Sequence, residues 1–400
     1  MYNFDEIIDR TGTCALNTDG FRHYIFNNDS SLEFKFKDEE FIRMWVADME
    51  FATPEVILDA IRERLDRRIF GYTMLIGDSY YKTFSKWCLD KYDWSFAQEE
   101  LMLSSGVVPA LKDLTKMLTK EGEKILFTAP SYAYFKYAAE GAGREWVCTD
   151  LQNTDGYFTI DFEDLERKAS DPLTSLFIFC NPQNPTGRVF SEEELHRVAE
   201  IIEKNDLWVI SDEIHCDLLR CGKRHIPLGK VMPDYKKLVT CMAPSKTFNL
   251  AGMLFSNIII RDSDLRTAWE DANESNCNPL SLTAAEAAYA KGGEWLEALK
   301  SYLDSNFEYA ANFFKEHLPK AVFTNSEATY LAWIDLSAYF DSTINLPLHF
   351  AQEAGVLLEG GSMFVQNSDS FIRLNLACPK STLKEGLKRI ISAIPLGDFK

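Results

Sequence analysis

The sequence lacks the features that mark membrane, secreted and nucleic-acid-binding proteins. No uncharged apolar run reaches the roughly 18 residues that a membrane span needs. The N-terminus has neither the cationic nor the apolar segment of a secretory signal. Basic residues are few: 42 Lys and Arg against 61 Asp and Glu give a formal net charge of −19, which repels a phosphate backbone or an anionic membrane surface. We therefore expect a cytoplasmic protein whose partners include neither nucleic acid nor a membrane.

The chain also lacks the paired cysteines of a disulfide framework. Its nine cysteines are odd in number and scattered, and several lie in apolar runs such as residues 177–180. That pattern is typical of buried thiols in a reducing compartment. His215, Cys216, Cys221 and His225 lie close in sequence, but without the recurring close pairs of a structural zinc site. We expect no metal site.

Length and hydrophobic patterning indicate an α/β protein. A chain of 400 residues, 46% of them hydrophobic, predicts two or three structural units. Short apolar runs alternate with longer amphipathic segments, which is typical of a mostly parallel sheet. One helix is expected to begin after Ser191, with Glu194 completing a capping box, and to end near Asn205. The runs that predict buried strands are 124–128, 176–180, 207–211, 238–242 and 256–260.

The pattern changes after about residue 280, where an α+β unit is expected. The first 45 or so residues of the chain are polar, aromatic and irregular, so we expect them to pack against another part of the molecule rather than to fold alone. No internal repeat is present. The C-terminal unit is predicted to contain helices at 282–290 and 293–317, a strand at 329–336, a helix, a Gly- and Ser-rich loop at 359–362, a strand at 371–376 and a final helix.

The segment APSKTFNLAG, residues 243–252, is the most informative one for chemistry. Lys246 follows a buried strand directly, lies between a serine and a threonine, and is followed by a glycine at 252. Such neighbours can lower the pKa of the amine and let it form a Schiff base with an aldehyde cofactor. Taken alone, the segment is better explained by an ordinary loop lysine.

The segment SDEIH, residues 211–215, lies at the carboxyl end of a predicted strand, where ligands bind in open α/β sheets. Asp212 there can hold a pyridine nitrogen protonated, which makes the ring an electron sink. The alternative for Asp212 is a helix N-cap. Taken alone, His215 is better explained as a core histidine with satisfied hydrogen bonds.

Two upstream turns are further candidates. In NPQNPTG, residues 181–187, Asn184 lies between two prolines that fix its backbone, so its amide can be aimed at a ligand oxygen, although turn chemistry alone would explain the segment. In SSGVVPAL, residues 104–111, a strand, a glycine turn and a helix start are expected, and helix N-termini bind phosphate. Pro109 is also compatible with an ordinary first helical turn.

In their order along the chain, these segments resemble the site of fold type I pyridoxal-phosphate enzymes, the aspartate aminotransferase superfamily. The resemblance covers nearly the whole chain, and the combination is specific where each segment is not. Within that superfamily the chain is similar to the MalY/PatB-type cystathionine β-lyases, or carbon–sulfur lyases. Four further segments carry this similarity: MWVADMEF at 44–51, FGYT at 70–73, NPLS at 278–281 and RLNLACP at 373–379.

The resemblance implies a role for each candidate residue. Lys246 is the Schiff-base lysine and, with Tyr132, a catalytic residue. The cofactor, pyridoxal 5'-phosphate, is contacted at its ring by Tyr132, Asp212 at the nitrogen, Asn184 at the hydroxyl oxygen, and His215. Its phosphate is held by the amides of Val107 and Val108, by Ser245 and by Tyr72 of a second subunit. Arg373 binds the substrate carboxylate through its planar guanidinium; the alternative is a surface salt bridge.

Two positions depart from common patterns of the superfamily. Many aminotransferases have a tyrosine three residues after the aspartate, where this chain has His215, as the lyases do. Val365 stands where the family usually has a glycine after an aromatic residue, and we expect its bulk near the site entrance. The first departure favours a lyase, and the second leaves the substrate preference open.

The resemblance implies a large domain with a mostly parallel sheet that binds the cofactor, and a smaller α+β C-terminal domain. The expected activity is cleavage of cystathionine, cysteine or related thioether amino acids to a thiol, pyruvate and ammonia. An aminotransferase is the alternative, and a non-catalytic regulatory scaffold is a third hypothesis. A homodimer follows from the role of Tyr72. The predicted boundaries are 1–47 for the N-terminal arm, 48–284 for the large domain and 285–400 for the small domain.

Overall fold

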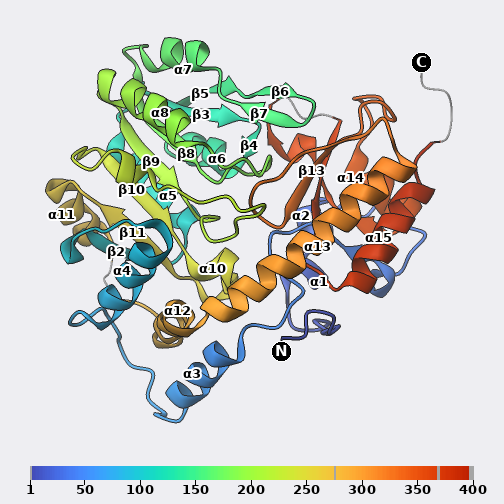
Figure 1. The fold of residues 1–400 in the computed structure, drawn as a ribbon, viewed down its shortest axis with the longest axis horizontal. Helices are drawn as coiled ribbons and strands as arrows, with labels where there is room; N and C mark the ends of the chain where they lie inside the picture. Colours follow the sequence, from blue (N-terminus) through green and yellow to red (C-terminus); the bar gives the residue numbers. More distant parts are fainter. Residues whose placement is uncertain (1, 274–275, 367–369, 396–400) are drawn as a thin grey trace.

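The computed structural model of the chain describes residues 2–273, 276–366 and 370–395 (Figure 1). Within these ranges no helix is long and apolar enough to cross a membrane. All nine cysteines are free; two, Cys14 and Cys221, are exposed, and six are buried, as the apolar surroundings in the sequence predict.

A seven-stranded sheet forms the centre of the larger part. Its strand order is β2-β11-β10-β9-β8-β3-β5. All neighbours are parallel except β11, which is antiparallel to both β10 and β2. The five predicted strands and the mostly parallel α/β fold are confirmed. The bounds are β2 Leu101–Ser104, β3 Lys124–Ala129, β5 Glu145–Asp150, β8 Thr174–Cys180, β9 Trp208–Asp212, β10 Leu238–Met242 and β11 Ser256–Ile260.

Helices cover both faces of this sheet, which explains why most residues in the middle of its strands are apolar. In β8, Leu176 and Ile178 pack with α5 (Val107–Leu118), α6 (Tyr134–Gly141) and α11 (Ser263–Ala272). Phe177 and Phe179 point the other way, toward α7 (Phe162–Ala169) and α8 (Glu192–Lys204). Alternate residues of a strand face opposite sides, so a sheet covered on both faces needs continuous apolar runs.

The predicted capping box begins α8. The Glu194 N–H donates to Ser191 Oγ at 3.2 Å, and the Ser191 N–H donates to Glu194 Oε2 at 2.7 Å. The helix therefore begins at the residue that the sequence predicts, and it brings the chain back to β9.

The smaller part contains a four-stranded antiparallel sheet in the order β12-β13-β17-β15. Helices α13, α14 and α15 pack against it in one apolar cluster. Figure 1 shows α13 running from the side of α12 to this part. The bounds are β12 Val322–Phe323, β13 Leu331–Asp335, β15 Glu359–Gly360, β17 Phe371–Asn375, α13 Gly293–His317, α14 Leu346–Ala354 and α15 Lys380–Ser392.

The predicted loop at 359–362 is wrong in its first half. Glu359 and Gly360 form β15, whose register partners in β17 are Arg373 and Ile372. Only Gly361–Met363 forms a turn, of the 3₁₀ type. Glycine is needed at 360 for packing, because a Cβ there would lie 2.6 Å from Pro347 Cδ. Composition predicted a loop, but long-range backbone pairing decides the structure at these two residues.

The N-terminal residues pack against both parts. Phe4 contacts Phe51 and Trp295, with ring centroids 5.2 and 5.7 Å apart. Further along, β1 (Ile42–Arg43) pairs in parallel with β14 (Val356–Leu357), and Figure 1 shows this blue segment beside the red C-terminal helices. The boundary predicted between residues 284 and 285 falls within α12 (Pro279–Lys291). The three domain boundaries stay predictions. The remaining elements are α1 Leu16–Asp19, α2 Phe21–Tyr24, α3 Glu55–Leu65, α4 Ser79–Tyr92, β4 Ser131–Tyr132, β6 Gln152–Thr154, β7 Tyr157–Thr159, α9 Leu228–Val231, α10 Pro244–Thr247 and β16 Phe364–Val365, with 3₁₀ turns at Asp38–Glu40, Gln98–Glu100 and Ala251–Met253.

Candidate active site

Three predicted residues follow three adjacent strands. Asn184 comes after β8, Asp212 is the last residue of β9, and Lys246 lies in α10, directly after β10. Neighbouring parallel strands end at the same edge of a sheet, so these side chains reach one region although they are far apart in sequence. The structure thus brings together the motifs that the sequence singled out.

Lys246 is partly buried, and its ammonium is held by the chain's own backbone. Its Nζ donates a hydrogen bond to the Ala47 carbonyl oxygen at 2.8 Å, and Tyr330 Oη donates to the same oxygen at 2.7 Å. Burial, assisted by the Arg373 guanidinium, lowers the pKa of Lys246 to about 8 despite nearby carboxylates. A neutral amine is therefore accessible close to neutral pH, in the direction the sequence predicts.

Asp212 is buried at the end of β9. The Ile214 N–H donates to Asp212 Oδ1 at 3.2 Å. Burial raises the pKa of Asp212 to about 7, although this hydrogen bond and Lys246 lower it. The alternative role of a helix N-cap is wrong, because residues 214–217 form a turn and no helix begins there. A cationic partner placed against a buried carboxyl of this kind stabilises its charged form.

His215 is buried three residues further on. Burial, with the cations Lys246 and Arg373, lowers its pKa to about 3, so the ring is neutral. Its Nδ1 is buried without a hydrogen-bond partner among the described residues. The interpretation of His215 as a satisfied core histidine is therefore wrong for this nitrogen, which is buried without a partner.

Arg373, on β17, is 2% exposed, which excludes a surface salt bridge. Its Nη1 donates to Asn184 Oδ1 at 3.0 Å and its Nη2 to the Trp45 carbonyl oxygen at 3.4 Å. Nη2 also forms an ion pair with Glu359. The Nε atom is buried without a partner among the residues that the structure describes.

Glu359 is a site residue that the sequence analysis missed. Burial raises the pKa of this carboxyl, while Arg373 and Lys246 lower it. One signal was available: Glu359 is the only charged residue in the run from 356 to 364. Its partner on another strand could not be inferred, because register between distant strands is a tertiary property.

Tyr132 lies on β4, which pairs with β16 so that Tyr132 is opposite Phe364 and Ser131 is opposite Val365. Its ring stacks on Tyr134 at a centroid distance of 5.0 Å. Burial raises the pKa of Tyr132 well above its usual range, so the phenol stays neutral. Val365 is buried beside this strand, and its effect on the entrance stays a prediction.

The start of α5 offers an anion site. Val107 and Val108 are its first two residues, and Gly106 precedes them without any side-chain cap. The first N–H groups of a helix have no intrahelical partners and favour an anion. Ser245 lies in the first turn of α10. These groups fit the phosphate of pyridoxal 5'-phosphate, while Asp212 and the unpartnered His215 Nδ1 and Arg373 Nε fit its ring and a bound carboxylate.

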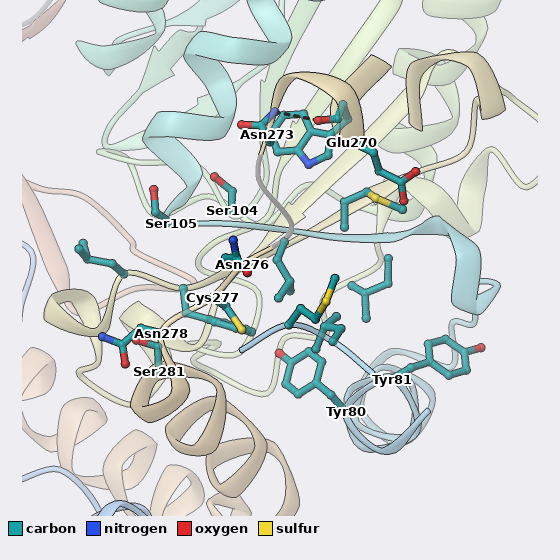
Figure 2. Close-up of a pocket in the computed structure, with 18 of the residues that line it drawn as sticks. Tyr80, Tyr81, Ser104, Ser105, Glu270, Asn273, Asn276, Cys277, Asn278 and Ser281 are labelled. Carbon is teal, nitrogen blue, oxygen red and sulfur yellow. Dashed lines mark hydrogen bonds between the residues drawn. The ribbon is translucent and has the colours of Figure 1, made fainter. Parts of the chain in front are cut away.

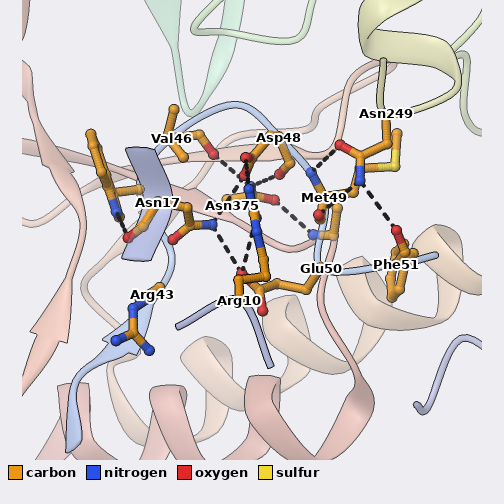
Figure 3. A network of polar contacts seen from close by, with 12 residues as sticks. Arg10, Asn17, Arg43, Val46, Asp48, Met49, Glu50, Phe51, Asn249 and Asn375 are labelled. Atoms are coloured by element: carbon orange, nitrogen blue, oxygen red, sulfur yellow. Dashed lines mark hydrogen bonds and ion pairs between the residues drawn. The ribbon is translucent and has the colours of Figure 1, made fainter. Parts of the chain in front are cut away.

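A polar network fixes the segment that carries Ala47 (Figure 3). Arg10 from the N-terminal arm forms an ion pair with Asp48 at 2.7 Å. Asn249 Nδ2 donates to the Met49 carbonyl oxygen at 2.9 Å, and Asn375 Nδ2 donates to the Val46 carbonyl oxygen at 2.7 Å. The arm, the loop after Lys246 and the end of β17 therefore all position the backbone acceptor of Lys246. Asp48, Asn249 and Asn375 lie in motifs that are evident in the sequence, but their role in fixing the Ala47 carbonyl is visible only in the structure.

A hollow of about 1120 Å³ lies beside the start of α5, and its lining includes Ser105 and Pro109 but not Lys246 (Figure 2). The segment between α3 and α4 borders it. Tyr72 in this segment is 98% exposed, so within one chain it contacts no cofactor site. Its neighbours form an exposed apolar run, and two of them, Met74 and Ile76, line the hollow. The large exposed side chains of the run are Ile69, Phe70, Tyr72, Met74 and Ile76.

Known proteins resemble the chain along its whole length. The family model for aminotransferase class I and II matches residues 39–390. Cystathionine beta-lyase PatB of Bacillus subtilis (strain 168) is 38% identical over 98% of this chain and 100% of its own length. Protein MalY of Escherichia coli (strain K12) is 30% identical over 98% of this chain and 99% of its own. The crystal structure of the PLP-bound C-S lyase from Staphylococcus hominis superposes with a TM-score of 0.94 at 46% identity and covers 98% of both chains. The chain therefore belongs to the class I and II aminotransferase family of pyridoxal-phosphate enzymes with the type I fold, and within it lies close to PatB and MalY.

Proposed function

We propose that the protein is a carbon–sulfur β-lyase that cleaves cystathionine, cysteine or related thioether amino acids. Cystathionine and water would give homocysteine, pyruvate and ammonia. The observation that carries the proposal is that Lys246, Asp212 and Arg373 come together in the site. Lys246 has a lowered pKa, Asp212 is a buried carboxyl and Arg373 is a buried guanidinium, as their proposed roles require. The kinship with PatB and with the Staphylococcus hominis lyase supports the choice of reaction.

Pyridoxal 5'-phosphate, when bound, supplies a ring that accepts electrons from the substrate α-carbon. Asp212 would hold the ring nitrogen protonated, Asn184 would bond the ring hydroxyl oxygen, and Tyr132 would stack on the ring. The α5 N-terminus and Ser245 would hold the phosphate. His215 would present its unpartnered Nδ1 to the same ligand.

Lys246 is proposed to hold the cofactor and, once released, to take the substrate α-proton. A lysine with an ordinary pKa is almost fully charged near pH 7 and takes no proton, whereas a pKa of about 8 leaves a useful neutral fraction. Nζ returns to the Ala47 carbonyl when it carries the proton, because that oxygen is already within hydrogen-bond distance. The network of Figure 3 keeps this acceptor in place.

Product analysis with the loaded enzyme tests the reaction type. We expect pyruvate and a thiol from cystathionine without any added keto acid. Amino transfer that depends on a keto acid, without thiol release, would identify an aminotransferase instead. Cofactor binding without a spectral response to any amino acid would favour a non-catalytic scaffold.

We propose that the enzyme works as a homodimer in which Tyr72 reaches the phosphate of the partner's site. The support is the exposed apolar run around Tyr72 next to the hollow of Figure 2, which a second copy of the chain would cover. Contiguous exposed apolar side chains of this kind are typical of interfaces.

Subunit complementation tests this arrangement. Tyr72→Ala and Lys246→Ala are each expected to be nearly inactive, since each removes one part of every site. Mixing them under conditions that exchange subunits should restore about a quarter of the wild-type activity, because half of the dimers are mixed and each has one intact site. No recovery in a mixture shown to contain mixed dimers would refute the role of Tyr72 across the interface.

A further inference from the structure

The guanidinium of Arg373 is already occupied by a carboxylate of the same chain. Glu359 and Arg373 are register partners on the antiparallel strands β15 and β17, so their side chains leave the sheet side by side. Both are buried, with side-chain exposures of 8% and 2%, and they form an ion pair. The group proposed to bind the substrate carboxylate therefore has an internal anion in contact with it.

Because of the geometry of the guanidinium, Glu359 and a ligand carboxylate compete for the same nitrogen of Arg373. A carboxylate binds arginine most strongly through two parallel N–H bonds, which the Nε–Nη2 edge and the Nη1–Nη2 edge can offer. Both edges include Nη2. In this structure Nη2 is the nitrogen that contacts Glu359 and the Trp45 carbonyl oxygen, whereas Nη1 is bonded to Asn184 and Nε is unpartnered. Both N–H groups of Nη2 therefore have an acceptor in this structure, so a ligand carboxylate that binds with two bonds has to take one of these two places, and beside Glu359 it would face a like charge.

We infer that Glu359 is a specificity-determining residue that takes the place of the substrate's α-carboxylate on Arg373 until substrate displaces it. The inference rests on the proposed function, because it assumes that Arg373 binds the α-carboxylate of an amino acid. Glu359 keeps a buried guanidinium paired in the free enzyme, and its displacement lowers the net gain from binding. Only a ligand with its own carboxylate can replace the ion pair that is lost.

The surroundings of Glu359 explain why its charge matters for binding. Tyr24 from α2 and Tyr132 from β4 line the same region, and burial raises the pKa of both phenols, with Glu359 adding to the shift. The two phenols carry no positive charge. The cations that lower the pKa of Glu359 are Arg373 and Lys246. Each carboxylate that enters the site competes with Glu359 for these two cations.

The test measures binding of L-alanine, which has the α-carboxylate but no group to eliminate. Glu359→Gln in the cofactor-loaded enzyme is expected to bind L-alanine about tenfold more tightly in a calorimetric titration, since the neutral amide competes poorly for Nη2. L-Alaninamide, which lacks the carboxylate, should change in affinity by less than about twofold. With a sulfur amino acid, KM should fall while kcat changes by less than about twofold.

Glu327→Gln is the matched control. Glu327 is also a largely buried carboxylate paired with an arginine, Arg188, but it belongs to a different cluster. Its substitution should leave the affinity for L-alanine unchanged. An affinity of Glu359→Gln equal to or weaker than that of the wild type, or an equal gain for L-alanine and L-alaninamide, would overturn the inference.

A crystal structure of the wild-type enzyme with L-alanine keeps the inference testable if Glu359→Gln does not fold. We expect the ligand carboxylate on Nη2 and Glu359 displaced from it. Glu359 still on Nη2 beside a bound ligand carboxylate would refute the competition. Failure of the wild type to bind L-alanine in either experiment would instead refute the proposed function, and with it this inference.

Discussion

Replacing Lys246 with alanine is expected to reduce pyruvate release by at least about 10⁴-fold, because this one side chain is proposed to supply both the cofactor attachment and the base. No other amine replaces Lys246: in the described part of the chain, the other cation that acts on the site is Arg373, whose guanidinium is engaged by Asn184 and Glu359. The measurement is steady-state pyruvate release from cystathionine or cysteine.

Lys86→Ala is the matched control for this substitution. Lys86 lies on α4 with 73% of its side chain exposed and pairs with Asp90. Its loss should leave turnover unchanged. Pyruvate release from Lys246→Ala within tenfold of the wild type would show that another group carries the reaction. Circular dichroism of the variant, expected to match the wild type, separates lost chemistry from lost folding.

The sequence predicted those parts of the fold that depend on local patterns. The strands at 124–129 and 238–242 are covered on both faces, so most of their residues are apolar and the strands are easy to identify. The capping box at Ser191 is a local hydrogen-bond motif. The loop predicted at 359–362 failed because Gly-Gly-Ser composition is a local signal, whereas β15 exists through its pairing with β17.

The same division applies to the site. The placement of Lys246, Asp212 and Asn184 at one edge of the sheet could be predicted, because each lies at or just after the end of a strand in a recognisable motif. Glu359 could not be paired with Arg373 from sequence, since the contact depends on the register of two strands that are separated by residues 361–370. The acceptor of Lys246 is a backbone carbonyl, Ala47, and a backbone atom has no residue-type signal at all.

The overall charge of −19 and the charges of the site describe different regions of the molecule. Exposed acidic residues determine the former, and they repel polyanions. In the site, the cations Lys246 and Arg373 lie among the buried carboxyls Asp212 and Glu359. The pKa values of Lys246, Asp212 and Glu359 are set by burial first and by neighbouring groups second, so bringing an anionic cofactor or substrate into the site shifts the pKa of these three groups.

Asp212→Asn is expected to lower turnover by roughly 10²- to 10³-fold and, in the cofactor-free protein, to raise stability at neutral pH. Turnover falls because a neutral amide cannot hold a positive ring nitrogen. Stability rises because the carboxyl is buried, with a pKa of about 7 against the ordinary 3.8. Between these values the folded protein binds a proton that the unfolded chain has lost, so the contribution of Asp212 to stability is full below about pH 4 and is lost as the pH rises through about 7.

Asparagine at position 212 does not titrate. The difference in stability between Asp212→Asn and the wild type therefore reports the pH dependence that the buried carboxyl contributes. The stability gain of Asp212→Asn should be small near about pH 4 and reach about 4 kcal/mol near about pH 8, measured by denaturant unfolding of the cofactor-free proteins. Asp206→Asn, at a position where 78% of the side chain is exposed, should show no such trend. A gain that is independent of pH would contradict the buried, protonated carboxyl, and unchanged turnover would contradict the role of Asp212 at the ring nitrogen. We therefore expect turnover to fall and the stability of the cofactor-free protein to rise. Burying the carboxyl costs free energy in the cofactor-free protein, and a cation placed against it offsets that cost.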